Sequence, residues 1–174
     1  MKSAFLLLLL AMSAVAQPRY FPLLNRALSQ VDASAIRRAS TPQSHHYPGV
    51  LLVAAVLYSK PHPNNPRSGD AATLALACKA GDVLAEESEG GAYTKRGDHH
   101  RDTYMWLEAY RVLLPKLGAA RQMRWRRELM KLVAGLADEA AARRDRPAFT
   151  SPFGVSVNHT ALFSSTVYLA GHVF

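Results

Sequence analysis

The sequence contains a single cysteine, Cys78, among its 174 residues. A disulfide needs two cysteines and a cysteine-rich zinc site needs several thiolates, so the chain can form neither by itself. Cys78 lies in an apolar segment with helical spacing. We therefore expect a small buried side chain at this position and not a catalytic thiol.

Long hydrophobic runs are also missing. The two longest apolar stretches, residues 4–12 and 50–58, fall well short of the roughly 20 residues that a membrane-spanning helix needs. Motifs for nucleotide binding or a serine nucleophile (the P-loop, G-x-G-x-x-G and G-x-S-x-G) are absent. The histidines lack the spacing of a metal-binding helix, so we expect no metal and no cofactor.

Acidic residues are in the minority, because 13 Asp and Glu stand against 21 Lys and Arg. The resulting net charge of +8 favours a polyanionic partner such as nucleic acid, anionic lipid or acidic polysaccharide. A hydrophobic fraction of 49% excludes a disordered polymer. The length is compatible with one domain.

The N-terminus has the layout of a secretory signal peptide. Lys2 precedes the apolar run of residues 4–12, and the small residues 13–16 fit a cleavage site before Gln17. We expect a signal peptide over residues 1–16, a mature chain over residues 17–174 and a secreted or periplasmic protein; an uncleaved anchor is the alternative. Export disfavours nucleic acid as the partner and favours an acidic polysaccharide or oligosaccharide. After cleavage of the signal peptide we expect no stable membrane span.

Helical spacing dominates the mature chain, and no segment alternates apolar and polar residues as a strand does. The expected fold is all-α, built from antiparallel helical hairpins. Residues 86–100 are expected to be irregular. Helices are expected over residues 22–38 (one or two helices), 49–60, 71–85, 119–144 and 158–174. Asp70 is the expected N-cap of the helix over 71–85, and a further helix is expected to begin at Asp102 or Thr103 and to end at about residue 117.

The last expected helix is strongly apolar, and no polar segment follows it in the sequence. An exposed apolar helix face would promote association. We therefore expect that the sequence is the N-terminal piece of a longer helical domain. Docking of this helix onto the preceding ones is the alternative explanation.

Asn158 and His159 are the candidate catalytic residues. They follow a loop rich in Pro, Gly and Ser and open the last helix, where the free backbone N–H groups and the helix dipole favour an anion. Asn can donate a hydrogen bond to a carboxylate, and His can donate, accept or bear charge. The alternative is that Asn158 is an N-cap and His159 an exposed first-turn residue.

A second cluster opens the helix near residue 102 and supplies candidate substrate-binding residues. Aromatic rings can stack on a sugar while neighbouring Arg and Asp side chains bind its hydroxyl groups. The alternative is structural: the aromatic residues are equally suited to the core, and the charged residues to an ion pair at the start of the helix. Residues 121–131 form an Arg-rich stretch that is either a solvated helix face or a groove for an acidic polymer. The four candidate substrate-binding residues are Arg101, Asp102, Tyr104 and Trp106.

Two stretches resemble the α/α-toroid polysaccharide lyases of the alginate lyase and heparinase II/III-like group. They are residues 151–171, SPFGVSVNHTALFSSTVYLAG, and residues 100–111, HRDTYMWLEAYR. The resemblance implies part of an incomplete toroid and β-elimination on a uronate-containing glycan. In that group an Asn neutralises the uronate carboxylate, which Asn158 matches, and His159 matches its partner or base. The group's catalytic Tyr and Arg usually lie further downstream, so Tyr168 is not assigned the role of the base.

Two other functions remain open. A toroid glycoside hydrolase would need a pair of carboxylates, for which Asp102 and Glu108 are the candidates beside aromatic residues. A non-catalytic exported module would instead bind an anionic glycan through the Arg-rich stretch of residues 121–131.

Overall fold

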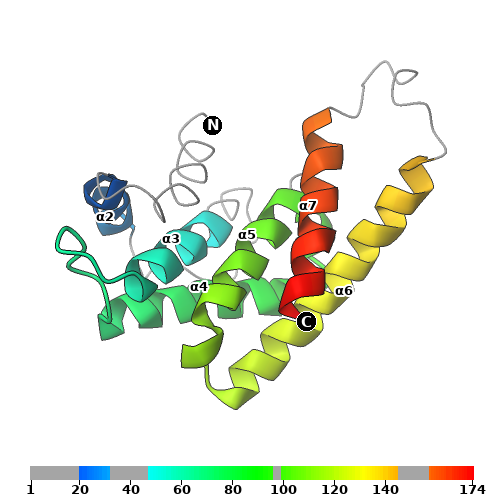
Figure 1. The fold of residues 1–174 in the computed structure, drawn as a ribbon. Helices are drawn as coiled ribbons and strands as arrows, with labels where there is room; N and C mark the ends of the chain where they lie inside the picture. Colours follow the sequence, from blue (N-terminus) through cyan, green and yellow to red (C-terminus); the bar gives the residue numbers. More distant parts are fainter. Residues whose placement is uncertain (1–19, 32–46, 96–98, 145–156) are drawn as a thin grey trace.

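The computed structural model describes residues 20–31, 47–95, 99–144 and 157–174, without the side chains of residues 140, 142–144 and 157–163. All regular structure in these ranges is helical, which confirms the all-α prediction (Figure 1). The expected signal peptide, residues 1–16, lies outside the described residues. The helices are α2 (Phe21–Ser29), α3 (Tyr47–Ser59), α4 (Ala71–Glu89), α5 (His99–Leu113), α6 (Ala119–Arg144) and α7 (Val157–Val173), with short 3₁₀ turns η3 (Tyr93–Lys95) and η4 (Leu114–Lys116).

Most predicted helix boundaries agree with the structure. Asp70 is the N-cap of α4, because its Oδ2 accepts hydrogen bonds from the backbone N–H of Thr73 at 2.8 Å and from the Thr73 hydroxyl at 2.6 Å. The prediction of an irregular segment over residues 86–100 is wrong at both ends. α4 continues to Glu89, and α5 begins at His99. Gly91, with φ +68°, supplies the left-handed turn that follows α4.

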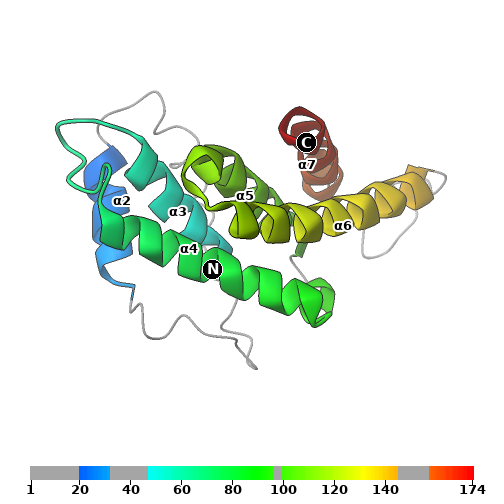
Figure 2. The ribbon, with the colours of Figure 1, turned by 90° about the horizontal axis from the view of Figure 1, so that it is seen from below.

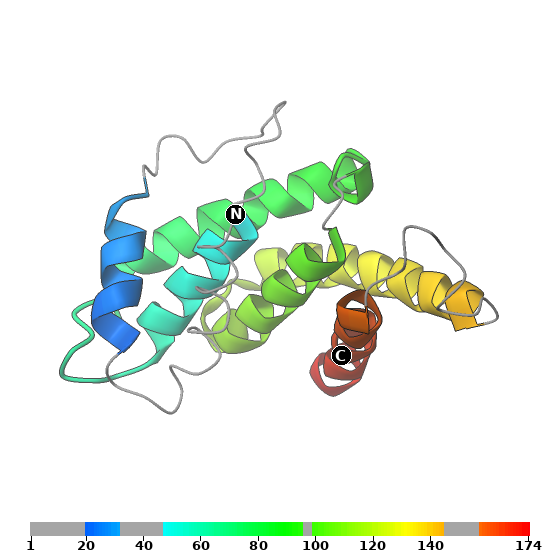
Figure 3. The same ribbon diagram turned by 90° about the horizontal axis from the view of Figure 1, so that it is seen from above.

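α3 is the apolar centre of the fold. All of its residues from Leu51 to Leu57 are buried, and α3 packs against both α4 and α5. A helix that is apolar on every side must be surrounded by other helices. In Figures 1 to 3, α2 lies at one end of the molecule and the far end of α6 at the other, with α3 and α4 between them.

The loop after α3 is held by one buried side chain, Asn65. Its Nδ2 donates to the carbonyl oxygens of Leu57 at 2.7 Å and Lys60 at 2.6 Å, and its Oδ1 accepts from the backbone N–H of Arg67 at 3.3 Å. Asn65 therefore satisfies carbonyls that the end of α3 would otherwise leave unpaired.

α6 crosses α4 at an unusually close contact. The spacing of Trp125, Leu129, Leu132, Leu136 and Ala140 predicts a buried stripe along this helix. The first four are buried, and the side chain of Ala140 lies outside the described part of the structure. The Trp125 ring lies on Gly81 of α4, and a Cβ atom at this position would overlap the ring atoms Cζ2 and Cη2. Only glycine permits this approach. The two helices stay in contact to the end of α4, and α6 continues beyond it (Figures 2 and 3).

The described part of α7 docks onto α5 and α6, as the alternative explanation for this apolar helix supposed. Thr166 and Ala170 are buried, and the ring of Phe174 lies 6.0 Å from that of Tyr110. The Arg126 guanidinium of α6 lies 5.4 Å from the centre of the same Phe174 ring. α5 and α7 both run from the upper to the lower part of Figure 1, so they are roughly parallel.

Candidate functional site

The four predicted substrate-binding residues all lie on α5, but the structure separates them. Asp102 and Trp106 have no exposed surface, whereas Arg101 keeps about a quarter of its side chain in solvent. The Nε of Arg101 lies 3.9 Å from Oδ1 of Asp102. This pair corresponds to the helix-start ion pair that the sequence allowed, and Asp102 presents no surface to a ligand in this structure.

Trp106 is a core residue and not a sugar platform here. Its ring lies 5.8 Å from that of Tyr93 in η3 and 6.2 Å from that of Trp125 in α6. Its indole N–H has no hydrogen-bond partner within the described ranges. A large aromatic side chain contributes most when it is buried in this way, which corrects the expected role of Trp106.

Tyr104 lines a cavity between α5 and α7. The cavity has a volume of about 510 Å³, within the range of small-molecule sites. Tyr104 and Glu108, one turn apart, form its α5 wall. The α7 wall consists of Ser164, Ser165, Tyr168 and Leu169. This arrangement presents two phenols, two hydroxyls and a carboxylate to one space.

Tyr104 is held in its protonated form. Burial raises the pKa of Tyr104, and the negative charge of Glu108 and a hydrogen bond with it raise the pKa further, while Arg111 opposes the shift. Glu108 in turn accepts hydrogen bonds from Arg111 Nη2 at 2.8 Å and Nε at 2.9 Å. A neutral phenol donates a hydrogen bond and is not poised to act as a base.

Tyr168 is the cavity residue that the sequence analysis missed as a binding group. It is 72% exposed, and its ring meets the edge of the His172 ring at 4.5 Å. An exposed aromatic ring beside a cavity is a natural surface for the C–H face of a sugar. The sequence does contain a signal for this wall. Ser164 and Tyr168 are four residues apart, as Tyr104 and Glu108 are, so each pair lies on one face of its helix.

Asn158 and His159 lie in the first turn of α7, and their side chains are outside the described part of the structure. Asn158 precedes Ser165 by seven residues. Positions seven apart share one face of an α-helix and lie about 10 Å apart along its axis. The predicted catalytic pair therefore occupies the same helix as the α7 wall of the cavity, two turns nearer its N-terminus.

The Arg-rich stretch of α6 is largely neutralised by acidic residues. Arg121 makes a two-pronged pair with Asp82, with N···O distances of 2.9 Å from Nε to Oδ1 and from Nη2 to Oδ2. The indole N–H of Trp125 donates to the same carboxylate at 2.9 Å. Asp82 thus joins a charged contact to the aromatic contact between α4 and α6.

Further along the same two helices, Glu89 accepts from Arg124 at 3.0 and 2.7 Å and from Arg127 at 2.6 Å. The fully buried carboxylate of Glu128 accepts from Arg127, Lys131 and Ser88 at 2.8, 3.0 and 3.0 Å. Burial raises the pKa of Glu128, but these hydrogen bonds outweigh burial and leave the pKa below its usual value. Arg124 and Arg127 therefore join α6 to Glu89 of α4, whereas Glu128 pairs with basic residues of its own helix and is linked to α4 through Ser88.

Two other expectations can be placed in the structure. Cys78 is buried, and burial raises the pKa of its thiol, as for a small apolar side chain. Glu108 lines the cavity but Asp102 does not, so the carboxylate pair of a hydrolase is not assembled among the described residues. The same ranges contain no group of three His, Cys, Asp or Glu side chains placed to bind a metal.

The described helices include none with the length and apolar character needed to cross a membrane. Comparisons of the chain with protein-family models, with curated proteins and with solved structures found no match.

Proposed function

We propose that this chain is the N-terminal part of a secreted or periplasmic α/α-toroid protein, similar to polysaccharide lyases, that acts on a uronate-containing glycan. The observation that supports the proposal is the cavity between α5 and α7. Its polar walls suit a sugar chain, and the helix that forms one wall carries Asn158 and His159 in its first turn.

The proposed reaction is a β-elimination. The amide of Asn158 and the N-terminus of α7 neutralise the uronate carboxylate, which acidifies the proton on C5. His159 acts as the base or as the partner of a base. The C5–H bond breaks, its electron pair forms the C4=C5 double bond, and the C4–O bond breaks. The departing oxygen takes a proton, so that each cleavage yields one unsaturated uronate and one new chain end.

Tyr104 binds substrate in this proposal. Its raised pKa keeps the phenol protonated, and because its proton bonds to Glu108, its oxygen accepts a hydrogen bond from a sugar hydroxyl. Arg101, which pairs with the buried Asp102 and is about a quarter exposed near the start of α5, presents guanidinium N–H groups to the glycan. Neither residue is assigned the role of the base.

The two rival functions receive less support. A retaining or inverting hydrolase needs two carboxylates facing the sugar, and Asp102 is fully buried beside Arg101. A binding module acting through the Arg-rich stretch needs available cations, and Arg124 and Arg127 are paired with Glu89.

The test is incubation of the full-length protein with uronate-containing polysaccharides. A lyase produces a C4=C5 double bond conjugated with the carboxylate, so ultraviolet absorbance rises together with the number of reducing ends. Asn158→Ala should abolish the rise and leave the helical circular dichroism intact. Asn64→Ala, which removes an exposed amide from the loop after α3, is the matched control and should retain activity.

Two results would contradict the proposal. Reducing ends that appear without absorbance indicate hydrolysis, and full turnover by Asn158→Ala excludes Asn158 as the neutralising group.

A further inference from the structure

We propose that Tyr168 of α7 is a stacking platform for a sugar unit that lies about three units along the glycan from the uronate at Asn158. The inference rests on the proposed function and specifies the length of its substrate. A glycan then needs about four units to reach both positions, so the protein favours chains over short fragments.

The exposure of the Tyr168 ring is the first argument. Four large apolar side chains are exposed in the described ranges, and Tyr168 is the most exposed of them at 72%. Tyr168 lines the cavity, whereas the other three do not line it in this part of the chain; they are Leu23, Met123 and Met130. An aromatic ring stabilises a fold most when it is buried. Tyr168 instead keeps its ring in solvent at the edge of a cavity.

The contact of the ring with His172 is the second argument. His172 lies one turn further along α7, and the two rings are T-shaped, with centres 4.5 Å apart and planes at 75°. In a T-shaped pair the edge of one ring meets the face of the other, so His172 covers at most one face of Tyr168. At least one face is left for a sugar. Because the contact holds the ring in one orientation, stacking costs little conformational entropy.

The residues around the ring are the third argument. Leu169 adds apolar surface, and Ser164 adds a hydroxyl that can donate or accept a hydrogen bond. The sequence of α7 contains no Asp, Glu, Lys or Arg, and Glu108 on the other wall is paired with Arg111 at 2.8 Å. Uronates and neutral sugars both present C–H groups to an aromatic face. The platform therefore recognises a sugar ring and not its charge.

The position of Tyr168 along α7 is the fourth argument. Tyr168 follows Asn158 by ten residues, which corresponds to about 15 Å along the helix axis and less than a quarter of a turn around it. A pyranose ring is much smaller than this distance, so the two residues cannot contact the same unit. The α7 wall of the cavity begins at Ser164, between the two positions. A glycan bound at Asn158 therefore reaches Tyr168 by running along α7.

The experiment is calorimetric binding of mannuronate oligomers of two and six units to the full-length protein. We expect the hexamer to bind about tenfold more tightly than the dimer. Tyr168→Ala should weaken binding of the hexamer about fivefold and leave binding of the dimer unchanged. In the absorbance assay the same variant should raise KM for the hexamer and leave kcat unchanged, because the ring contacts a unit remote from the cleaved bond.

Three further variants separate the ring from other effects. Tyr168→Phe keeps the aromatic face and should retain the affinity for the hexamer within about twofold. His172→Ala should lower this affinity about twofold, and His172→Phe should restore it by returning a ring to the contact. Met123→Ala removes an equally exposed side chain that is not on the cavity wall, and it should leave both affinities unchanged.

An unchanged affinity of Tyr168→Ala for the hexamer would overturn the inference while leaving the proposed function in place. An equal loss for the dimer and the hexamer would overturn the remote position of the platform in the same way. Failure of the wild-type protein to bind or cleave any uronate oligomer would overturn the proposed function itself, together with the inference.

Discussion

In the contact between α4 and α6, polar side chains pair with one another across the two helices. In the contact between α5 and α7, polar side chains surround a cavity. Between α4 and α6, an indole ring lies on Gly81, and two carboxylates of α4, Asp82 and Glu89, pair with arginines of α6. Between α5 and α7, hydroxyls, phenols and one carboxylate surround about 510 Å³ of open space. The first contact pairs charged groups directly across two helices, and the second places its polar groups around an open space.

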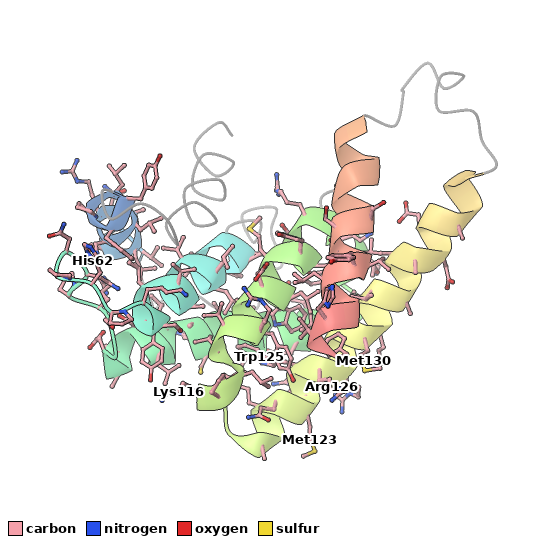
Figure 4. All side chains as sticks on the ribbon, viewed as in Figure 1. His62, Lys116, Met123, Trp125, Arg126 and Met130 are labelled. Carbon is pink, nitrogen blue, oxygen red and sulfur yellow. The ribbon has the colours of Figure 1, made fainter. Side chains whose placement is uncertain are left out.

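The comparison shows that a run of basic residues is not by itself a site for a polyanion. Arg121, Arg124 and Arg127 gave the stretch its basic appearance, yet each lies within 3 Å of a carboxylate. In Figure 4, Met123 projects away from the helices, whereas Trp125 lies within the packed interior. The function of each residue on α6 is therefore set by the helix face it occupies.

The largest effect is expected from filling the space beneath Trp125. In Gly81→Ala the new methyl group would overlap the indole ring at Cζ2 and Cη2. We expect a loss of about 3 kcal/mol in the free energy of unfolding, measured by urea titration. Gly135→Ala is the control, because nothing lies within 4 Å of its Cβ position on an exposed face of α6. This variant should gain up to about 1 kcal/mol from helix propensity. Equal effects at the two glycines would show that the close contact does not exist.

A smaller effect is expected from removing the charge of Glu128. Glu128→Gln weakens three hydrogen bonds at a fully buried carboxylate, and we expect a loss of about 2 kcal/mol in the free energy of unfolding at neutral pH. Asp138→Asn, an exposed change on the same helix, should alter it by less than about 0.5 kcal/mol.

The same carboxylate predicts a pH dependence. The pKa of Glu128 in the folded state is lower than its ordinary value of 4.5, so its contribution to stability is complete above pH 4.5 and is lost as the pH falls through the folded-state pKa. Unfolding followed from neutral to strongly acidic pH should therefore show a smaller acid-induced loss in Glu128→Gln than in the wild-type protein. An equal loss in both would assign acid sensitivity to other carboxylates.

The smallest effect concerns ligand binding at the two contacts. Arg101→Gln should weaken binding of a uronate-containing oligosaccharide about tenfold, because Arg101 lies 3.9 Å from Asp102 and makes a looser ion pair than Arg124 does. Arg124→Gln should change it by less than about twofold, because Arg124 is already paired with Glu89 at 2.7 Å. Calorimetry at two salt concentrations measures both, with thermal unfolding as the control for folding. A greater loss of affinity in Arg124→Gln than in Arg101→Gln would place the glycan-binding site on α6.

Local signals in the sequence were sufficient for much of the fold. The spacing of Trp125, Leu129, Leu132 and Leu136 predicted the buried face of α6, and Asp70 predicted the start of α4. These features depend on residues three or four apart. The start of α5 was predicted too late in the sequence, because a cap-forming residue such as Asp102 can also occupy the interior of a first turn.

The candidate site was less predictable because its residues meet across long sequence separations. Tyr104 was expected to bind substrate and lies on the cavity, but Trp106, two residues later, is turned into the core by the helix itself. Glu89 and Arg124 are 35 residues apart, so no local pattern indicated that the Arg-rich stretch was neutralised. The partner of a charged side chain is a property of tertiary packing.

Asn65 also affects how the protein ages. Asparagine is converted to aspartate when the backbone nitrogen of the next residue attacks the side-chain carbonyl. The next residue here is Pro66, whose nitrogen has no hydrogen and cannot perform this attack. The amide that holds the end of α3 is therefore shielded from the commonest spontaneous damage to asparagine, so the Asn65 hydrogen bonds should outlast those of ordinary surface asparagines.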